Sequence, residues 1–317
     1  MLSASASHRP ADEQQEELQT RALLNDITGD AIERQLLFPS ARQLRGFSRH
    51  QSHNQQQFSV QTDAGAFFVK CLDQSLHHRL VAEQESLLRI METQTITVCA
   101  PLALGSIQRP DMPSVSYLIL QHIPLAVHGD WFSAGQQVAQ MHTHTSSHGY
   151  GFDMPTWCGN TRQDNRWQSD WCDFFTAQRL QPLFDQLRAQ GTDIAHQWQA
   201  LEYSCHHLHG HQPAASLLHG DLWSGNIGFN PDKKLSYPVL FDPSGYYGDA
   251  ESDLAMTELF GRFPKKFYDG YQSVRMIDDD YPLRRPVYQL YHLLNHALLF
   301  GGSYIPQAEN LTAQMKL

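Results

Sequence analysis

The 317-residue sequence lacks an apolar run long enough to span a bilayer, and its amino terminus lacks the apolar core of a secretion signal. Positive charge is scarce as well. The 23 lysines and arginines are outnumbered by 33 acidic residues, which gives a formal net charge of −10. This balance argues against a nucleic acid or an anionic membrane as the main partner. Any bound phosphate must then be held by a few local residues or a metal ion. Because the sequence lacks both a secretion signal and a membrane-spanning run, we expect a cytoplasmic protein.

Cysteines are few, and the five in the sequence include no C-x-x-C pair. An odd count without paired spacing does not fit a disulfide scaffold, so reduced thiols are expected. Histidines are more frequent, with clusters at 142–148 (HTHTSSH) and 206–211 (HHLHGH). No acid or thiol stands near them at a familiar zinc-ligand spacing. Solvated helix ends are therefore expected there, rather than a metal site.

The first half of the chain has the pattern of an α+β domain. Residues 1–15 are small and polar and are predicted to be disordered, and 16–37 predict helical segments broken near Gly29. Two β-rich runs around Asp63-Ala64-Gly65 predict a hairpin whose second strand ends at Lys70. A helix over 78–93 and strands over 98–105 and 116–123 follow, which together predict an antiparallel sheet with a helix.

After Pro124 the pattern becomes mainly helical. We place a boundary there and predict an N-terminal lobe over residues 16–124 and a C-terminal lobe over 125–317. The hydrophobic fraction of 41% is sufficient for a substantial core in a chain of this length.

One loop in the second half carries a distinctive group of polar residues. In LLHGDLWSGNIGFN (217–230), Asp221 and Asn226 lie between apolar anchors, and Asp242 follows the strand-like run VLF. Phosphoryl transfer from ATP needs a carboxylate for the attacking hydroxyl, oxygen ligands for magnesium and a cation for the phosphates. Asp221 would be the base, and Asn226 and Asp242 would supply the hard oxygen ligands that Mg²⁺ prefers.

The cation is expected from the first half of the chain. Lys70 ends a predicted strand, and Glu83 lies on the helix that follows, as in the lysine–glutamate pair of protein kinases. Glu85 is the competing partner. Taken singly, each residue has an ordinary explanation: Asp221 as a turn former, Lys70 as a solvated strand end. Their order along the chain favours the chemical interpretation.

Longer segments resemble a known family. The runs LLHGDLWSGN, the segment from Asp242 to Tyr271 and YQLYHLLNHALLFGGSY look like those of fructosamine kinases, also called ketosamine-3-kinases, and the resemblance extends from about residue 40 to the C-terminus. It implies a two-lobed protein-kinase-like α+β fold related to aminoglycoside and choline phosphotransferases. It also implies phosphorylation of the sugar 3-hydroxyl of fructosamines or ribulosamines with ATP and Mg²⁺. The phosphorylated adduct then releases the amine, which repairs glycated proteins.

The resemblance implies roles for individual residues. It makes Asp221 the catalytic base, Asn226 and Asp242 the magnesium ligands, and Lys70 and Glu83 the pair that holds the phosphates. The run LILQHIP resembles the hinge that meets adenine, through Leu120, Gln121 and Ile123. Asp253 resembles a buried acid that supports the catalytic loop, although it could instead cap a helix that begins near 251. Trp223 is a candidate substrate platform or a core residue, and His142 resembles a structural histidine.

The sequence also departs from the family pattern. The stretch that corresponds to the nucleotide loop has Gly46 alone and His53-Asn54 where Ile-Asn is usual. Fewer glycines should weaken a phosphate cradle, so a nucleotide-binding pseudokinase remains an alternative. A kinase of another hydroxylated amine is a second one. Gly220 replaces the arginine of protein kinases, which predicts no phosphorylation switch. Fructose- or ribose-derived substrate, free or on a protein lysine, and oligomeric state all stay open.

Overall fold

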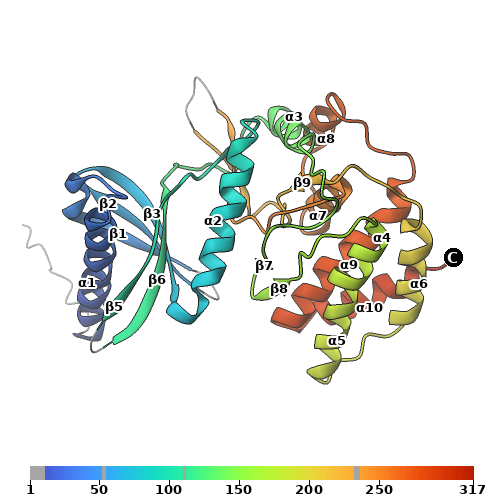
Figure 1. Cartoon of the computed structure of the whole chain (residues 1–317), viewed down its shortest axis with the longest axis horizontal. Coiled ribbons are helices and arrows are strands. Elements are labelled where there is room, and N and C mark those ends of the chain that lie inside the picture. The colour runs from blue at the N-terminus through green and yellow to red at the C-terminus, as the bar shows by residue number, and fades with distance from the viewer. Residues whose placement is uncertain (1–10, 52–54, 110–111, 232–235) are drawn as a thin grey trace, which may run out of the picture. The chain divides into compact units, whose positions relative to one another are not determined.

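The computed structural model describes residues 11–51, 55–109, 112–231 and 236–317, and Figure 1 labels its elements. The chain forms two compact units. Unit 1 consists of Met1–Leu80 and Pro101–His122, and unit 2 of Val81–Ala100 and Ile123–Leu317. The chain thus passes into unit 2 close to Pro124, but residues 81–100 of the predicted N-terminal lobe group with unit 2. One reason is that β4 (Thr97–Val98) pairs in parallel with β11 (Pro238–Leu240).

Unit 1 is built on a five-stranded antiparallel sheet in the order β1-β2-β3-β6-β5. Its strands are β1 (Leu44–His50), β2 (Gln56–Thr62), β3 (Gly65–Asp73), β5 (Pro101–Arg109) and β6 (Met112–Gln121). The predicted hairpin is confirmed, with Thr62 opposite Gly65. The position of Lys70 is a correction: β3 continues to Asp73, so Lys70 lies inside the strand and is buried. Strand β1 was not expected from the sequence.

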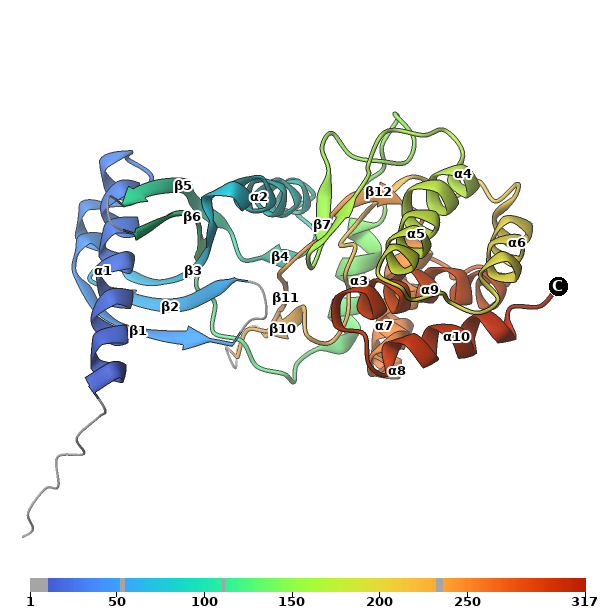
Figure 2. The same cartoon turned by 90° about the horizontal axis from the view of Figure 1, so that it is seen from below.

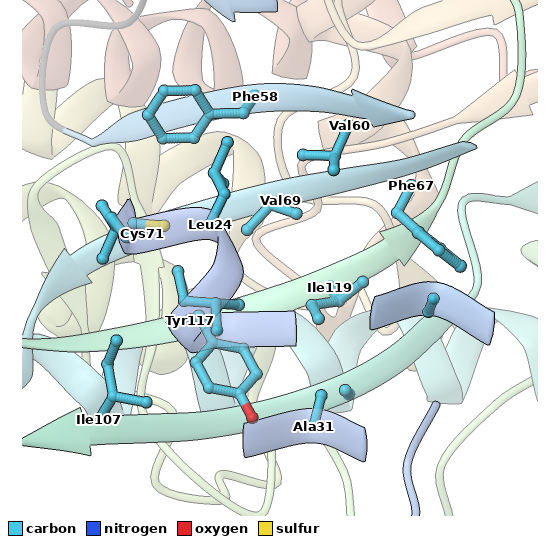
Figure 3. Packing of buried hydrophobic residues seen from close by; sticks show 14 residues of the cluster. Leu24, Ala31, Phe58, Val60, Phe67, Val69, Cys71, Ile107, Tyr117 and Ile119 are labelled. Carbon is cyan, nitrogen blue, oxygen red and sulfur yellow. The ribbon is translucent and has the colours of Figure 1, made fainter. Parts of the chain in front are cut away.

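Helix α1 (Ala11–Glu33) lies across this sheet (Figures 1 and 2). The prediction of disorder up to residue 15 is wrong for 11–15, and residues 1–10 lie outside the described part. The break near Gly29 is also wrong, because the helix continues through it. Apolar side chains at helical spacing hold α1 in place: Leu24, Ile27 and Ala31 join the strand residues Phe58, Val60, Val69 and Ile119 in one buried cluster (Figure 3).

Unit 2 is mainly helical, as predicted. After α2 (His77–Glu92), which begins in unit 1, its helices are α3 (Trp131–Met141), α4 (Trp171–Phe175), the π-helical turn η3 (Thr176–Leu180), α5 (Gln181–Ala189), α6 (Gln197–Leu208), α7 (Ala250–Leu259), α8 (Lys265–Gln272), α9 (Tyr281–Phe300) and α10 (Tyr304–Gln314). Helix α10, which packs on α9 (Figure 2), was not expected. No helix among the described residues is both long and apolar enough to cross a membrane.

Short strands connect these helices. β7 (Thr156–Cys158) pairs with β8 (Thr161–Gln163), β9 (Ser216–Leu218) with β12 (Tyr246–Gly248), and β10 (Ile227–Phe229) with β11. The loop over residues 219–226 therefore connects β9 to β10, and all residues of these two strands are buried. The β7–β8 hairpin was not expected, because strands of three residues are too short to show an alternation of apolar and polar side chains.

Helices α3 and α8 approach each other closely at two glycines. A Cβ at Gly135 would lie 1.9 Å from the carbonyl oxygen of Phe267, and one at Gly270 would lie 2.0 Å from that of Phe132. The two backbones are therefore in direct contact. This close packing matters for the site, because His142 directly follows α3 and Tyr271 lies on α8.

We expect Gly135→Ala to lower the free energy of unfolding by about 1–3 kcal/mol or more, because the added methyl meets backbone that cannot yield. Gly29→Ala in α1 is the matched control. Nothing lies within 4 Å of its Cβ position, so the substitution should stabilise the helix by about 0.5–1 kcal/mol. Denaturant unfolding of both variants measures the two effects. Similar effects in both would contradict backbone contact between α3 and α8.

Candidate functional site

The site in unit 2 is built from two neighbouring segments. The 219–226 loop joins β9 to β10, and the 241–245 segment joins β11 to β12, the partner strands of the first pair. Backbone hydrogen bonds join the two segments. The Ser244 amide donates to the His219 carbonyl at 2.8 Å, and the Phe241 amide donates to the Asn226 carbonyl at 3.2 Å. Strand pairing thus brings Asp221 and Asp242 to the same place.

Gly220 is required by this close approach. Its φ is +81°, a conformation that other residues rarely adopt, and a Cβ there would lie 2.2 Å from the carbonyl oxygen of Ser244. The position therefore has no room for the arginine that protein kinases have there.

Asp253 holds the loop from behind. Its carboxylate accepts the amide N–H groups of His219 at 2.7 Å and Gly220 at 2.9 Å, and it bonds the ring of His142 at 3.1 Å. The other ring nitrogen of His142 bonds the hydroxyl of Tyr271 at 2.9 Å. Burial by itself would raise the pKa of Asp253, but the hydrogen bond and charge of His142, together with His219, outweigh it and lower the pKa.

The helix-cap explanation for Asp253 is wrong. Helix α7 begins at Ala250, and its N-cap is Asp249, whose side chain accepts the amide of Glu251 at 3.1 Å. Asp253 lies one turn inside the helix. It is 1% exposed and directs its carboxylate at the loop.

His219 fixes the start of the loop through its ring. One ring nitrogen bonds the carbonyl of Phe241 at 3.0 Å, and the other accepts the amide of Asp221 at 3.3 Å. Burial lowers the pKa of His219, so the ring is neutral with the proton on Nε2. The imidazole therefore links the two segments without adding charge.

Asp221 has one satisfied and one unsatisfied oxygen. Its Oδ2 accepts from the Asn226 amide at 3.0 Å, while its Oδ1 is buried with no hydrogen-bond partner among the described residues. Burial raises the pKa of Asp221 to about 7. The Asn226 bond lowers it in part, and the charges of Asp242 and Asp253 raise it further. A carboxylate with a pKa near neutrality is a suitable proton acceptor at physiological pH.

Asn226 bonds this carboxylate, and Asp242 acts on it through its charge. The Asn226 amide nitrogen also donates to the backbone carbonyl of Asp221 at 2.9 Å, which closes the loop. Asp242 has φ +55° and precedes a proline, a strained conformation of a kind that clusters at functional sites. Oxygen donors and mutually repelling carboxylates are a donor set that suits a hard divalent cation.

Helix α2 touches the second segment. Ser86 accepts the amide of Gly245 at 3.3 Å, and Glu83 lies one turn earlier on the same helix. Its competitor Glu85 forms an ion pair with Arg89 at 3.0 Å. Lys70 belongs to unit 1 and Glu83 to unit 2, and their pairing stays a prediction.

The remaining predicted residues are placed as follows. Trp223 is half-buried with its ring against Gly225. Leu120 is buried near the end of β6, Gln121 ends that strand exposed, and Ile123 is the first residue of unit 2 after it. Gly46 lies at a bulge inside β1, rather than in a loop. His53 and Asn54 lie outside the described residues.

Two further residues of this site could not be predicted from the sequence. The β7–β8 hairpin and α9 bring Cys158 and His292 next to Asp221. The carbonyl of Trp157 accepts the Ser244 hydroxyl at 2.8 Å, which attaches the hairpin to the 241–245 segment. These contacts join residues more than sixty positions apart, so local spacing could not have revealed them.

The histidines of the two clusters differ in exposure. His144, His148, His206 and His209 are exposed, as expected for solvated ends. The ring of His211 bonds Asp249 at 2.8 Å, an acid 38 positions away that spacing in the sequence does not reveal. All five cysteines are free thiols.

We expect Gly220→Ala to destabilise the protein more than Gly210→Ala. Both glycines have positive φ, which costs other residues about 1–2 kcal/mol, but nothing lies within 4 Å of the Cβ position of Gly210. The difference between the two unfolding free energies isolates the collision with Ser244. Equal losses would show that the 219–226 loop can move away from the 241–245 segment.

The raised pKa of Asp221 predicts a pH-dependent penalty in the metal-free protein. Between about pH 4 and pH 7 the folded state binds a proton that the unfolded state has lost, so this carboxyl lowers stability progressively as pH rises through that range. Asp221→Asn removes the penalty. Its melting temperature relative to wild type, measured with a chelator present, should therefore rise from pH 4.5 to pH 8.

The exposed Asp193 provides a control, because Asp193→Asn should show no such trend. A constant offset between Asp221→Asn and wild type across the whole pH range would contradict the raised pKa.

Known proteins share this sequence and fold. Residues 41–317 match the sequence profile of the family described as "Fructosamine kinase". A Vibrio parahaemolyticus protein named "Probable ketoamine kinase" is 38% identical over 246 residues, 77% of this chain and 82% of its own. An Escherichia coli K12 protein of the same description is equally similar over the same shares.

Solved structures of related proteins have a similar fold. A crystal structure described as "Putative fructosamine-3-kinase" from Haemophilus somnus 129PT superposes with a TM-score of 0.79 at 26% identity, over 86% of this chain and 91% of that one. The aminoglycoside phosphotransferase APH(4)-Ia shares the fold, with a TM-score of 0.62 at 14% identity over 90% of this chain and 98% of its own. The two-lobed kinase-like fold is thereby confirmed, and the chain belongs to the fructosamine kinase family of phosphotransferases.

Proposed function

We propose that this phosphotransferase moves the γ-phosphoryl group of ATP to the sugar 3-hydroxyl of a ketosamine, with Asp221 as the base. The observation that carries the proposal is the buried, unpartnered Oδ1 of Asp221 beside a satisfied Oδ2. Such an oxygen is available to accept a hydrogen bond from a substrate hydroxyl. With a pKa near 7, the carboxylate can then take the proton as the phosphorus–oxygen bond forms.

The proposal assigns the loop's support a positioning role. Asp253 fixes the backbone at His219 and Gly220, and Asn226 orients the Asp221 carboxylate from the other side. Proton transfer requires the base and the hydroxyl to lie within hydrogen-bond distance. A rigid loop meets this requirement before substrate arrives, which avoids an ordering cost during the reaction.

Asn226 and Asp242 are the residues that we propose to hold Mg²⁺. Their oxygen donors fit it, and a cation would relieve the repulsion that Asp242 exerts on Asp221. When bound, Mg²⁺ neutralises charge on the phosphates. The residues Lys70 and Glu83 are proposed to bind the ATP phosphates, and Leu120, Gln121 and Ile123 the adenine.

The substrate class is proposed from the family and from charge. Ketosamines carry an amine, and a chain with net charge −10 favours cationic ligands over anionic ones. Trp223, half-buried in the loop that carries the base, is the proposed contact for the sugar. Both free ketosamines and glycated protein lysines fit this description, which would give the enzyme a role in deglycation.

An ATP-consumption screen tests the function. Fructosamines, ribulosamines, choline and aminoglycosides are supplied separately with ATP and Mg²⁺, and we expect turnover on a ketosamine. Asp221→Asn should lower kcat by about 10²–10⁴-fold, because a positioned base contributes about that factor. Asp193→Asn, at an exposed position, is the matched control and should retain the wild-type rate.

Other results would reject the proposal in distinct ways. Thermal stabilisation by ATP and Mg²⁺ without turnover on any substrate would indicate a pseudokinase. Turnover on choline or an aminoglycoside alone would replace the substrate class. Full activity in a folded Asp221→Asn variant would exclude Asp221 as the base.

A further inference from the structure

The Asp221 carboxylate belongs to a cluster of three different donor groups. One ligand atom each of Cys158, Asp221 and His292 lies within 4.8 Å of the other two. They come from three separate elements: β7, the 219–226 loop and α9. Cys158 is 2% exposed and His292 is 4% exposed, while Asp221 is partly open to solvent.

Two of these three residues have an unsatisfied buried atom. Asp221 Oδ1 and His292 Nδ1 are both buried, and neither has a hydrogen-bond partner among the described residues. Buried polar atoms are normally paired, because an unpaired one loses its hydration without compensation. Two of them beside one thiol indicate a place where a further group binds. Burial also lowers the pKa of His292 to about 3, so its ring is neutral and can donate a lone pair.

We propose that Cys158, Asp221 and His292 form a binding site for a thiophilic divalent cation of the Zn²⁺ class, which inhibits the enzyme by occupying the carboxylate of its base. The binding stands on the cluster alone, and the inhibition rests on the proposed function of Asp221. Sulfur, imidazole nitrogen and carboxylate oxygen are the three ligand types of zinc sites. Mg²⁺, for which Asn226 and Asp242 are proposed, does not select thiol and imidazole ligands.

The spacing is compatible with this chemistry. In a tetrahedral zinc site with bonds of about 2.0–2.3 Å, neighbouring ligand atoms lie about 3.3–3.8 Å apart. The three atoms here, all within 4.8 Å of one another, need to draw together by about 1.5 Å at most. A fourth ligand, such as water, would complete the tetrahedral set. On binding, the Cys158 thiol loses its proton to solvent and its sulfur donates the electron pair to the metal.

Neighbouring residues hold the thiol in place. The Asn295 amide donates to Cys158 Sγ at 3.2 Å and to the Cys158 carbonyl at 3.3 Å, and its oxygen accepts the Thr161 hydroxyl. Asn295 and His292 are three residues apart on α9, so a single helix orients both the ring and the thiol. Outer hydrogen bonds of this kind commonly orient metal ligands.

A second cluster is a weaker candidate. His211, Asp249 and Glu251 also lie close together, but their oxygens are already committed. Tyr288 donates to Asp249 at 2.6 Å, and Arg284 forms a two-pronged ion pair with Glu251 at 2.8 Å. A metal there would have to displace satisfied bonds.

Cobalt binding tests the site without reference to activity. Co²⁺ is titrated into the full-length, nucleotide-free protein, and the thiolate-to-cobalt charge-transfer band is followed in the near ultraviolet. We expect the band in wild type, its displacement by Zn²⁺, and its loss in Cys158→Ser. Cys205→Ser, at an exposed cysteine, should keep it. No band, or a band that survives in Cys158→Ser, would overturn the site.

His292→Phe provides a second variant that leaves the thiol in place and should weaken Co²⁺ binding by at least tenfold. It decides the question if Cys158→Ser does not fold, as judged by its melting temperature. Unchanged Co²⁺ affinity in His292→Phe would remove the imidazole from the proposed ligand set and overturn the site as stated.

The inhibition is tested in turnover with free Zn²⁺ held by a metal buffer and with saturating Mg²⁺ and ATP. Each variant is compared with its own zinc-free rate. The Zn²⁺ concentration for half-inhibition should rise by about 10–100-fold in Cys158→Ser. An unchanged value would overturn the inhibitory role. If wild type turns over no ketosamine, the proposed function fails, while the cobalt band still decides the site.

Discussion

The hydrogen bonds from the backbone of His219 and Gly220 to the Asp253 carboxylate are the constraint on which the site depends. They anchor the 219–226 loop to α7, and through His142 and Tyr271 they anchor α7 to α3 and α8. The glycine contacts between α3 and α8 make that support rigid, because two backbones in contact have little room to shift. A buried charge is expensive unless it is paired, and here three N–H groups supply the pairing.

The same support leaves Asp221 in a costly state. Asp253 is stabilised as an anion, while Asp221, on the loop that Asp253 holds, is half-buried, with one buried oxygen unpaired and a raised pKa. Two carboxylates in one small region therefore have opposite environments. Such separation of pKa values is typical of sites in which one acid acts as a base and another holds the structure. The loop cannot relax to solvate Asp221, because Asp253 holds its backbone at His219 and Gly220.

Local patterns predicted some elements and missed others for physical reasons. The β2–β3 hairpin followed from its turn residues and alternation, and the helices after Pro124, except α10, followed from their sequence pattern. Helix α1 was predicted with a break at Gly29 because glycine is a weak helix former, but burial of Leu24, Ile27 and Ala31 overrides that preference. Lys70 was placed at a strand end because charged residues are rarely buried, whereas it is 1% exposed inside β3. The β7–β8 hairpin was missed because its strands have three residues each.

The sequence by itself determined the order of the chemical groups and, through the family motifs, the membership of the chain in the fructosamine kinases. Asp221 and Asn226 are five positions apart, so chain connectivity keeps them within about 18 Å and spacing is sufficient to group them in one site. The tertiary structure alone decided which acid is anionic, which oxygen is left unpaired, and that Cys158 and His292 adjoin Asp221. Burial and long-range contact set pKa values and neighbours, and neither is a property of residues close together in the chain.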